Sequence, residues 1–150
     1  MLREEAAYFA SRWEDVARQP DAYWQDWVRA AAEGATRRLF VAEDDGAWLG
    51  VVGAYLRVDR TEAQLMSMWV DPGARRRGIA RRLIRAVAEW ARERGCARVY
   101  LFVQESNAPG QRLYLEAGFR PTGELERLPH RRGFKLLLWA PVEDLLVPGE

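Results

Sequence analysis

The stretch SMWVDPGARRRGIARRLI, residues 67–84, combines a strand-like apolar run, a Pro-Gly turn and the start of an arginine-rich helix. Three consecutive arginines, Arg75, Arg76 and Arg77, lie directly before Gly78 and the predicted helix. The helix dipole disfavours cations at this end of a helix. The formal net charge of the chain is +1, so a generally basic composition does not explain the cluster. The stretch therefore contains a local electrostatic conflict that a bound anion would remove.

The same residues predict a phosphate site. Gly78 lets the backbone turn and approach a ligand closely. The unpaired amides of the first helical turn point outward and favour an anion, and arginine side chains beside them can close around a phosphate. Arg81 lies near enough to the helix start to contribute. Arg85, one turn further along, is expected to reach at most a more distant part of such a ligand or to lie on a solvated helix face.

Composition limits the classes of function. The 150 residues fit one domain, 1–150, and the 49% hydrophobic content with seven tryptophans predicts a folded core. The balance of 23 basic against 22 acidic residues argues against a nucleic-acid partner. One cysteine and one histidine exclude a disulfide framework and a zinc site, so no metal is expected. No segment approaches the roughly 20 apolar residues that span a bilayer, so we expect a cytoplasmic protein without a membrane partner.

Hydrophobic periodicity predicts alternating helices and strands. In order, we expect helices at 3–18 and 22–32, three strands between 38 and 70 with a turn at Asp45-Gly46, a helix at 78–94, a strand at 97–103, a helix with Asn107 as its N-cap, and strands at 120–128 and 134–140. The helix at 78–94 is expected to bury one apolar face, formed by Ile79, Leu83, Val87, Trp90 and Ala91. The apolar run 97–103 is typical of a strand buried on both faces, and the preceding helix crossover predicts parallel pairing with an earlier strand. The fold class is therefore α/β, a mixed sheet covered by helices.

Two motifs give the chain a family resemblance. Arg75, Gly78 and Ala80 match the pattern Arg or Gln, two residues, Gly, one residue, Gly or Ala, which is typical of the GCN5-related N-acetyltransferase (GNAT) superfamily. The segment NAPGQRLYLEAGF, residues 107–119, is similar to the asparagine, Leu-Tyr and Gly-Phe segment of that family. The resemblance covers about residues 36–140. It departs from the family pattern at Gly110, where alanine is common, and at Ala80, where glycine is common.

The resemblance implies a mixed, mostly antiparallel sheet with a splayed parallel central strand pair, and acetyl-CoA as co-substrate. In such a protein the arginine loop binds the pyrophosphate, the backbone of the preceding strand end takes pantetheine and the acetyl oxygen, and the asparagine contacts the pantetheine arm. The implied cofactor-binding residues are Met68, Trp69, Val70, Arg75, Arg76, Arg77, Gly78, Ile79, Ala80, Arg81 and Asn107. The N-terminal helix pair of the family usually contributes to the acceptor site, which leaves the acceptor amine undefined.

Tyr114 is the candidate proton donor for the departing thiolate. In the resemblance it lies near the thioester sulfur, and a phenol with a pKa of about 10 is protonated at neutral pH. The other interpretation is a tyrosine packed in the core.

The general base is less clear, because Gln64 stands where many family members have glutamate, and an amide takes no proton at neutral pH. Glu62 is the candidate base, acting through ordered water, and Ser67 is a possible relay. An acceptor α-amino group with a pKa of about 8 would need little help.

The sequence therefore predicts an acetyl-CoA-dependent N-acetyltransferase acting on a primary amine of a small molecule, peptide or protein. The alternative is a non-catalytic acyl-CoA-binding or sensor domain, which the missing glutamate favours. His130 is interpreted as a solvated turn residue and Cys96 as a packed side chain. A monomer and a homodimer both remain open.

Overall fold

The computed structural model describes residues 29, 32–33, 35–57, 59, 61–129 and 132–147. Six strands form one sheet in the order β1-β2-β3-β4-β6-β5. The elements are β1 (Arg37–Asp44), β2 (Ala47–Leu56), β3 (Glu62–Val70), η2 (Pro72–Ala74), α3 (Ile79–Glu93), β4 (Arg98–Gln104), α4 (Ala108–Ala117), β5 (Arg120–Arg127), β6 (Phe134–Pro141) and α5 (Val142–Leu146). The predicted helices at 3–18 and 22–32 lie outside the described residues, except for residues 29, 32 and 33.

The strand pairings confirm a mixed, mostly antiparallel sheet. Among the described strands, only β3 and β4 pair in parallel, and α3 provides the crossover between them. The β1–β2 hairpin turns at Asp45 and Gly46, with φ angles of +48° and +80°. Positive φ at both central residues is what a type I′ turn requires, so this short-range prediction is also confirmed.

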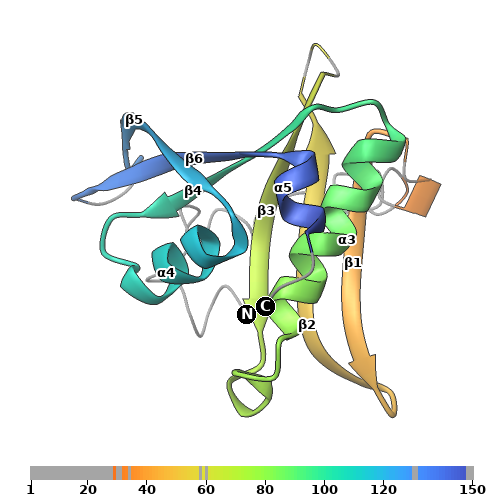
Figure 1. The fold of residues 1–150 in the computed structure, drawn as a ribbon. Coiled ribbons are helices and arrows are strands. Elements are labelled where there is room, and N and C mark those ends of the chain that lie inside the picture. Colours follow the sequence, from red (N-terminus) through yellow and green to blue (C-terminus); the bar gives the residue numbers. More distant parts are fainter. Residues whose placement is uncertain are drawn as a thin grey trace.

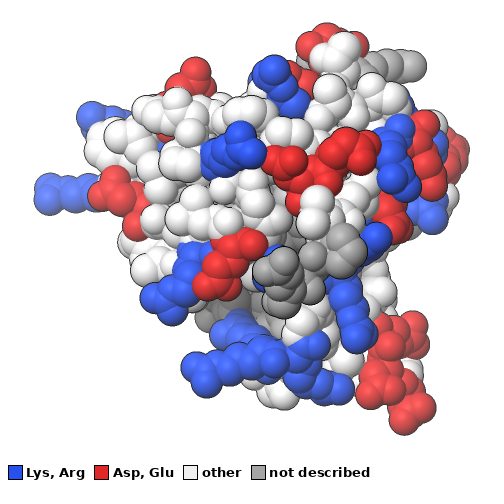
Figure 2. Space-filling model, in the orientation of Figure 1, with Lys and Arg blue, Asp and Glu red and all other residues white. Residues whose placement is uncertain are grey.

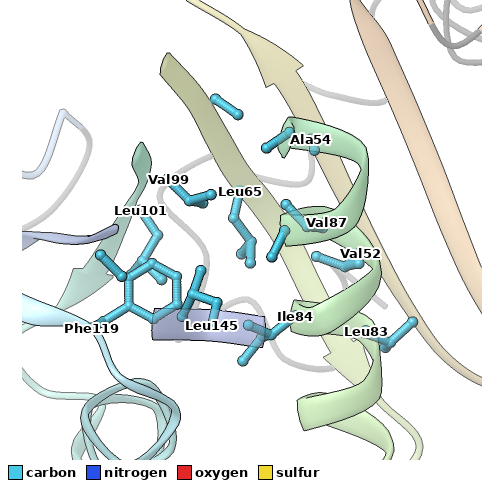
Figure 3. Close-up of a cluster of buried hydrophobic side chains, with 14 of the residues drawn as sticks. Val52, Ala54, Leu65, Leu83, Ile84, Val87, Val99, Leu101, Phe119 and Leu145 are labelled. Carbon is cyan, nitrogen blue, oxygen red and sulfur yellow. The ribbon is translucent and has the colours of Figure 1, made fainter. Parts of the chain in front are cut away.

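The helices α3, α4 and α5 cover one face of the sheet. Figure 1 shows α3 lying along β1, β2 and β3, with α5 beside it and α4 near β4 and β6. Ile84 and Val87 of α3 point toward the sheet in Figure 3, where Leu65 and Val99 from β3 and β4 meet them. The predicted apolar face of this helix is buried: Ile79, Leu83, Val87, Trp90 and Ala91. This packing fixes the helix start relative to the end of β3.

Gly50 of β2 permits the close approach of α3. A Cβ atom at this position would lie 3.0 Å from the Trp69 carbonyl oxygen and 3.1 Å from Cγ2 of Ile79. Trp69 lies at the end of β3, and Ile79 is the first residue of α3. The first residue of the helix therefore packs directly over the backbone of β2.

The burial of β4 differs from the prediction. We expected residues 97–103 to be buried on both faces, but Val99, Leu101 and Val103 are buried while Tyr100 and Phe102 are only half-buried. The run is continuously apolar because its second face carries aromatic rings. Helices α3, α4 and α5 pack on the other face only.

The sequence prediction also missed the short helix α5. Val142, Leu145 and Leu146 are buried at helical spacing, and acidic residues fill the first turn. The spacing was a usable signal, but five residues are too few for periodicity to stand out against the preceding strand.

Candidate active site

The parallel strands β3 and β4 separate after a short paired segment. Their register covers only Glu62 with Arg98, Ala63 with Val99 and Gln64 with Tyr100. Beyond these positions β3 remains paired with β2, and β4 remains paired with β6. Figure 1 shows β3 continuing toward the loop before α3 while β4 turns away from it. The facing strand edges therefore offer backbone donors and acceptors to a ligand.

A β-bulge lies on β3 beside this separation. Met66 faces Gly53 and Trp69 faces Val51, so Ser67 and Met68 together face one residue of β2. Ser67 has a φ of +55°, which is uncommon for a residue other than glycine. Bulges bend a strand and re-aim its side chains. Serine carries no sequence signal for this conformation, so the bulge was not predicted.

The loop after β3 is held against the strand end. The Asp71 carboxylate accepts a hydrogen bond from the Gly73 amide at 3.0 Å, and Nε of Arg75 donates to the Val70 carbonyl at 3.1 Å. Arg76 and Gly78 have φ angles of +65° and +77°. The turn predicted at Gly78 is thus present, and the Arg75 side chain holds the loop to the end of β3.

The start of α3 is electrostatically positive and uncapped. Gly78 makes no side-chain cap, and the first turn holds no acidic residue. The first amides of a helix have no acceptor within the helix. Arg76 and Arg77 are exposed beside them, and Figure 2 shows basic side chains gathered over this end of the molecule. Helix dipole, amides and guanidinium groups all favour an anion here.

Two arginines further along α3 already have structural partners. Arg81 Nη2 donates to the Glu116 carbonyl of α4 at 3.2 Å, and Arg85 Nη1 donates to the Leu146 carbonyl of α5 at 2.9 Å. Arg85 also pairs with Glu89 at 3.3 Å. These bonds tie α3 to its neighbouring helices. The proposed phosphate contact of Arg81 stays a prediction.

Asn107 caps α4, as predicted. Its Oδ1 accepts a hydrogen bond from the Gly110 amide at 3.0 Å. A Cβ atom on residue 110 would lie 2.5 Å from Nδ2 of Asn107, so the side chain in this position requires glycine there. The departure from the family's alanine thus has a steric reason. Because the cap uses Oδ1, Nδ2 is the atom of Asn107 that can donate to a ligand.

Tyr114 belongs to α4, and its side chain is buried in the core. It is 8% exposed and makes an edge-to-face contact with Phe119 at a centroid distance of 5.8 Å. Burial raises the pKa of the Tyr114 phenol above its ordinary value. The hydroxyl therefore keeps its proton throughout the neutral range. This position agrees with the packed interpretation of Tyr114, and its role as proton donor stays a prediction.

The candidate base lies away from the bulge. Glu62 begins β3, on the segment where β3 and β4 are still paired. Its carboxylate is 3.8 Å from Nη1 of Arg57 and accepts from the Tyr100 hydroxyl at 3.3 Å. Gln64 accepts a 2.7 Å hydrogen bond from Tyr55 instead of offering a base. The assignment of Glu62 stays a prediction that requires water to carry the proton.

Other groups add little to the site. Cys96 is buried, and burial raises the pKa of its thiol, as fits a packed side chain. His130 lies outside the described residues. Within the described ranges, no three Asp, Glu, His or Cys side chains gather as metal ligands. In that same part of the chain, no helix combines the length and apolar character needed to cross a membrane.

Comparisons with known proteins agree with this geometry. The model of the acetyltransferase (GNAT) family matches residues 1–119. A Bacillus subtilis protein named for [ribosomal protein bS18]-alanine N-acetylation is 26% identical over 141 residues, which cover 93% of this chain and 86% of that protein. The crystal structure of nourseothricin acetyltransferase has 28% identity and a TM-score of 0.65, covering 71% of this chain and 66% of that one.

A further structure has the same fold with a ligand. A Bacillus anthracis protein, named as a streptothricin acetyltransferase and solved in complex with acetyl coenzyme A, has a TM-score of 0.65 and 19% identity. The match covers 71% of this chain and 62% of that one. The chain spans only 28% and 40% of the length of two curated relatives that are 36% identical to it over the matched parts.

The contact between Asn107 and Gly110 predicts strong energetic coupling. Asn107→Ala should cost about 1 kcal/mol of folding stability by removing the cap. Gly110→Ala should leave the free energy of unfolding nearly unchanged. The new methyl group displaces the Asn107 cap, and the loss of the cap offsets a helix-propensity gain of up to about 1 kcal/mol. In the Asn107→Ala background, Gly110→Ala should stabilise by that gain. Urea unfolding of the four proteins measures the cycle, and additive effects would contradict the steric account.

Proposed function

The chain belongs to the acetyltransferase (GNAT) family, and on that premise we propose that it transfers an acetyl group from acetyl-CoA directly to a primary amine of a small molecule, peptide or protein. The observation that carries the proposal is the separation of β3 from β4 beside an uncapped, arginine-flanked helix start. An extended thioester cofactor with a pyrophosphate suits both features. The solved complex of the same fold with acetyl coenzyme A supports this assignment.

The cofactor would lie along two surfaces. Its pyrophosphate accepts hydrogen bonds from the first amides of α3, with Arg76 and Arg77 supplying positive charge. The pantetheine arm follows the free edge of β3 at Met68 to Val70, where backbone groups pair with it as a neighbouring strand would. Nδ2 of Asn107 is placed at the opposite side, on the turn that follows β4.

Acetyl transfer then needs a balanced exchange of bonds. The neutral amine attacks the thioester carbonyl, the C–N bond forms, and the C–S bond breaks. A backbone amide on the β3 edge stabilises the carbonyl oxygen as it becomes negative. The leaving thiolate takes a proton, for which Tyr114 is the proposed donor, and the acceptor nitrogen loses one to water. Glu62 is the proposed final base, reached through that water.

The second candidate function is binding of an acyl-CoA without turnover. The amide of Gln64, held by Tyr55 where a carboxylate is common, favours this alternative. Release of free thiol from acetyl-CoA in the presence of a panel of amines distinguishes the two. An acceptor amine with a pKa of about 8 is already partly neutral and reduces the need for a carboxylate.

The positive φ of Gly78 provides a test of cofactor binding with a matched control. Gly78 and Gly95 lie at the two ends of α3, both have a φ of +77°, and neither has an atom within 4 Å of a Cβ position. Alanine at either should cost a similar amount of stability, about 1–2 kcal/mol. Only Gly78→Ala should weaken CoA binding, by at least about tenfold, because its loop carries the pyrophosphate amides.

Isothermal titration with CoA measures this difference, and thermal unfolding checks that both variants are folded. Equal affinities for the two variants would show that the start of α3 does not bind the cofactor. A short DNA duplex serves as the anionic control and should not stabilise the protein.

Removal of the Tyr114 hydroxyl tests the proposed proton donor. Tyr114→Phe keeps the ring packed against Phe119, so stability and CoA affinity should hold while kcat falls about 10²–10⁴-fold. Because burial raises the pKa of this phenol, the wild-type kcat should not fall through deprotonation of Tyr114 below about pH 10. Normal turnover by the variant would remove Tyr114 from the mechanism.

The base role of Glu62 has a distinct pH dependence. Glu62→Gln should lower kcat/KM by about 10² below the pKa of the acceptor amine and have little effect above it, where the amine is already neutral. Glu89→Gln is the control, since Glu89 also pairs with an arginine, Arg85. A pH profile unchanged by Glu62→Gln would show that Glu62 is not the base and has only a structural role, through its contacts with Arg57 and Tyr100.

A further inference from the structure

Two buried N–H donors have no hydrogen-bond partner within the described part of the chain. Gln104 is 4% exposed and is the one buried polar residue among the described ranges. Its Nε2 and the indole Nε1 of Trp69 are both buried without a hydrogen bond. An unsatisfied buried donor costs about 1–3 kcal/mol, so such groups are rare in native proteins and need an explanation.

The two donors lie at corresponding ends of the separated strands. Trp69 is five residues beyond Gln64 on β3, and Gln104 is four residues beyond Tyr100 on β4, where Gln64 and Tyr100 form the last parallel pair. One donor therefore belongs to each side of the separation. The gap between the strand ends is the place where the proposed acetyl group meets its acceptor.

Strand alternation places both side chains on the face opposite α3. Leu101 and Val103 are buried under the helices, so Phe102 and Gln104 belong to the other face. Met68 and Val70 pack against the core, which assigns Trp69 between them to that other face as well. Since the cofactor loop and α3 lie on the first face, both donors belong to the face that α3 does not cover.

A hollow lies on this second face, beside Phe102 and not at the two donors themselves. Its volume is about 420 Å³, and its lining includes Phe102, two residues before Gln104. The remaining lining residues are Arg57, Glu124, Leu125, Glu126 and Leu137.

We propose that Gln104 Nε2 and Trp69 Nε1 donate hydrogen bonds to oxygen atoms of the acceptor. The acceptor would then be an amine with a neighbouring carbonyl, such as an amino-acid amide or a peptide N-terminus. A simple alkyl amine or polyamine offers no oxygen and leaves both donors unpaired. This inference rests on the proposed acetyltransferase function and adds the acceptor class.

The test compares two acceptors that differ in one substituent, which is a carboxamide in one and a methyl group in the other. Alaninamide and 2-aminopropane share the same branched amine, and each kcat/KM is corrected for the neutral fraction of the amine. The wild type should prefer alaninamide at least about tenfold. Gln104→Met should lower kcat/KM for alaninamide, through KM, and leave 2-aminopropane unchanged. Further amine pairs with and without the carbonyl extend the comparison.

Protein stability separates a binding role from a structural one. Gln104→Met removes an unsatisfied donor, so its Tm should equal or exceed that of the wild type. Gln111→Met is the matched control, because Gln111 Nε2 already donates to the carbonyls of Gln104 and Glu105 at 3.0 and 2.7 Å. This control should lower Tm without changing the preference between acceptors.

The outcomes are distinguishable. Equal use of the two amines by the wild type, or equal losses for both in Gln104→Met, would overturn the acceptor assignment while leaving acetyl transfer intact. If CoA still stabilised the protein but no amine of the panel led to thiol release, the proposed function and the acceptor assignment would both be overturned.

Discussion

The short parallel pairing of β3 with β4 is the constraint on which the site depends. Each strand keeps its outer neighbour, β2 for β3 and β6 for β4, so the two strand ends are fixed apart rather than loose. A sheet normally closes such a gap with hydrogen bonds. Here the gap is held open by the pairing on both sides and by the bulge at Ser67, and only a ligand with its own donors and acceptors can fill it.

Several features of this region reduce stability and make sense only with ligands bound. Arginines precede a helix start that repels them, the first helical turn has no acidic residue, and two buried donors lack partners among the described residues. Each is a local conflict, and natural proteins concentrate such conflicts at functional sites. The anionic cofactor would relieve the first two. Oxygen atoms of the acceptor would relieve the third, so both substrates complete interactions that the protein alone leaves unmade.

The sequence predicted the parts of the molecule that depend on local patterns. The apolar face of α3, the turn at Asp45-Gly46 and the Asn107 cap follow from periodicity and from residue types with defined conformational preferences. The parallel pairing of β3 and β4 followed from the helix crossover. The separation of β3 from β4 was implied by the family resemblance, because neither composition nor residue spacing predicts it.

What the sequence did not predict depends on contacts between distant segments. The bulge at Ser67 is set by the register of β3 against β2, and the missing partner of Gln104 is visible only when its surroundings are known. The apolar composition of 97–103 predicted burial on two faces, yet Phe102 lines a hollow. Glu62 was chosen for its place in the sequence near Gln64, and its contacts with Arg57 and Tyr100 are tertiary.

Amide hydrogen exchange with and without CoA tests the central claim that the strand separation and the helix start form one cofactor site. In the free protein, the amides of residues 68–70 that point away from β2 have no strand acceptor, and the first amides of α3, residues 79–81, have no helix acceptor. CoA should slow exchange in both segments together and leave β1 unchanged. Bound CoA that protects neither segment, or protects a different part of the sheet, would contradict the account.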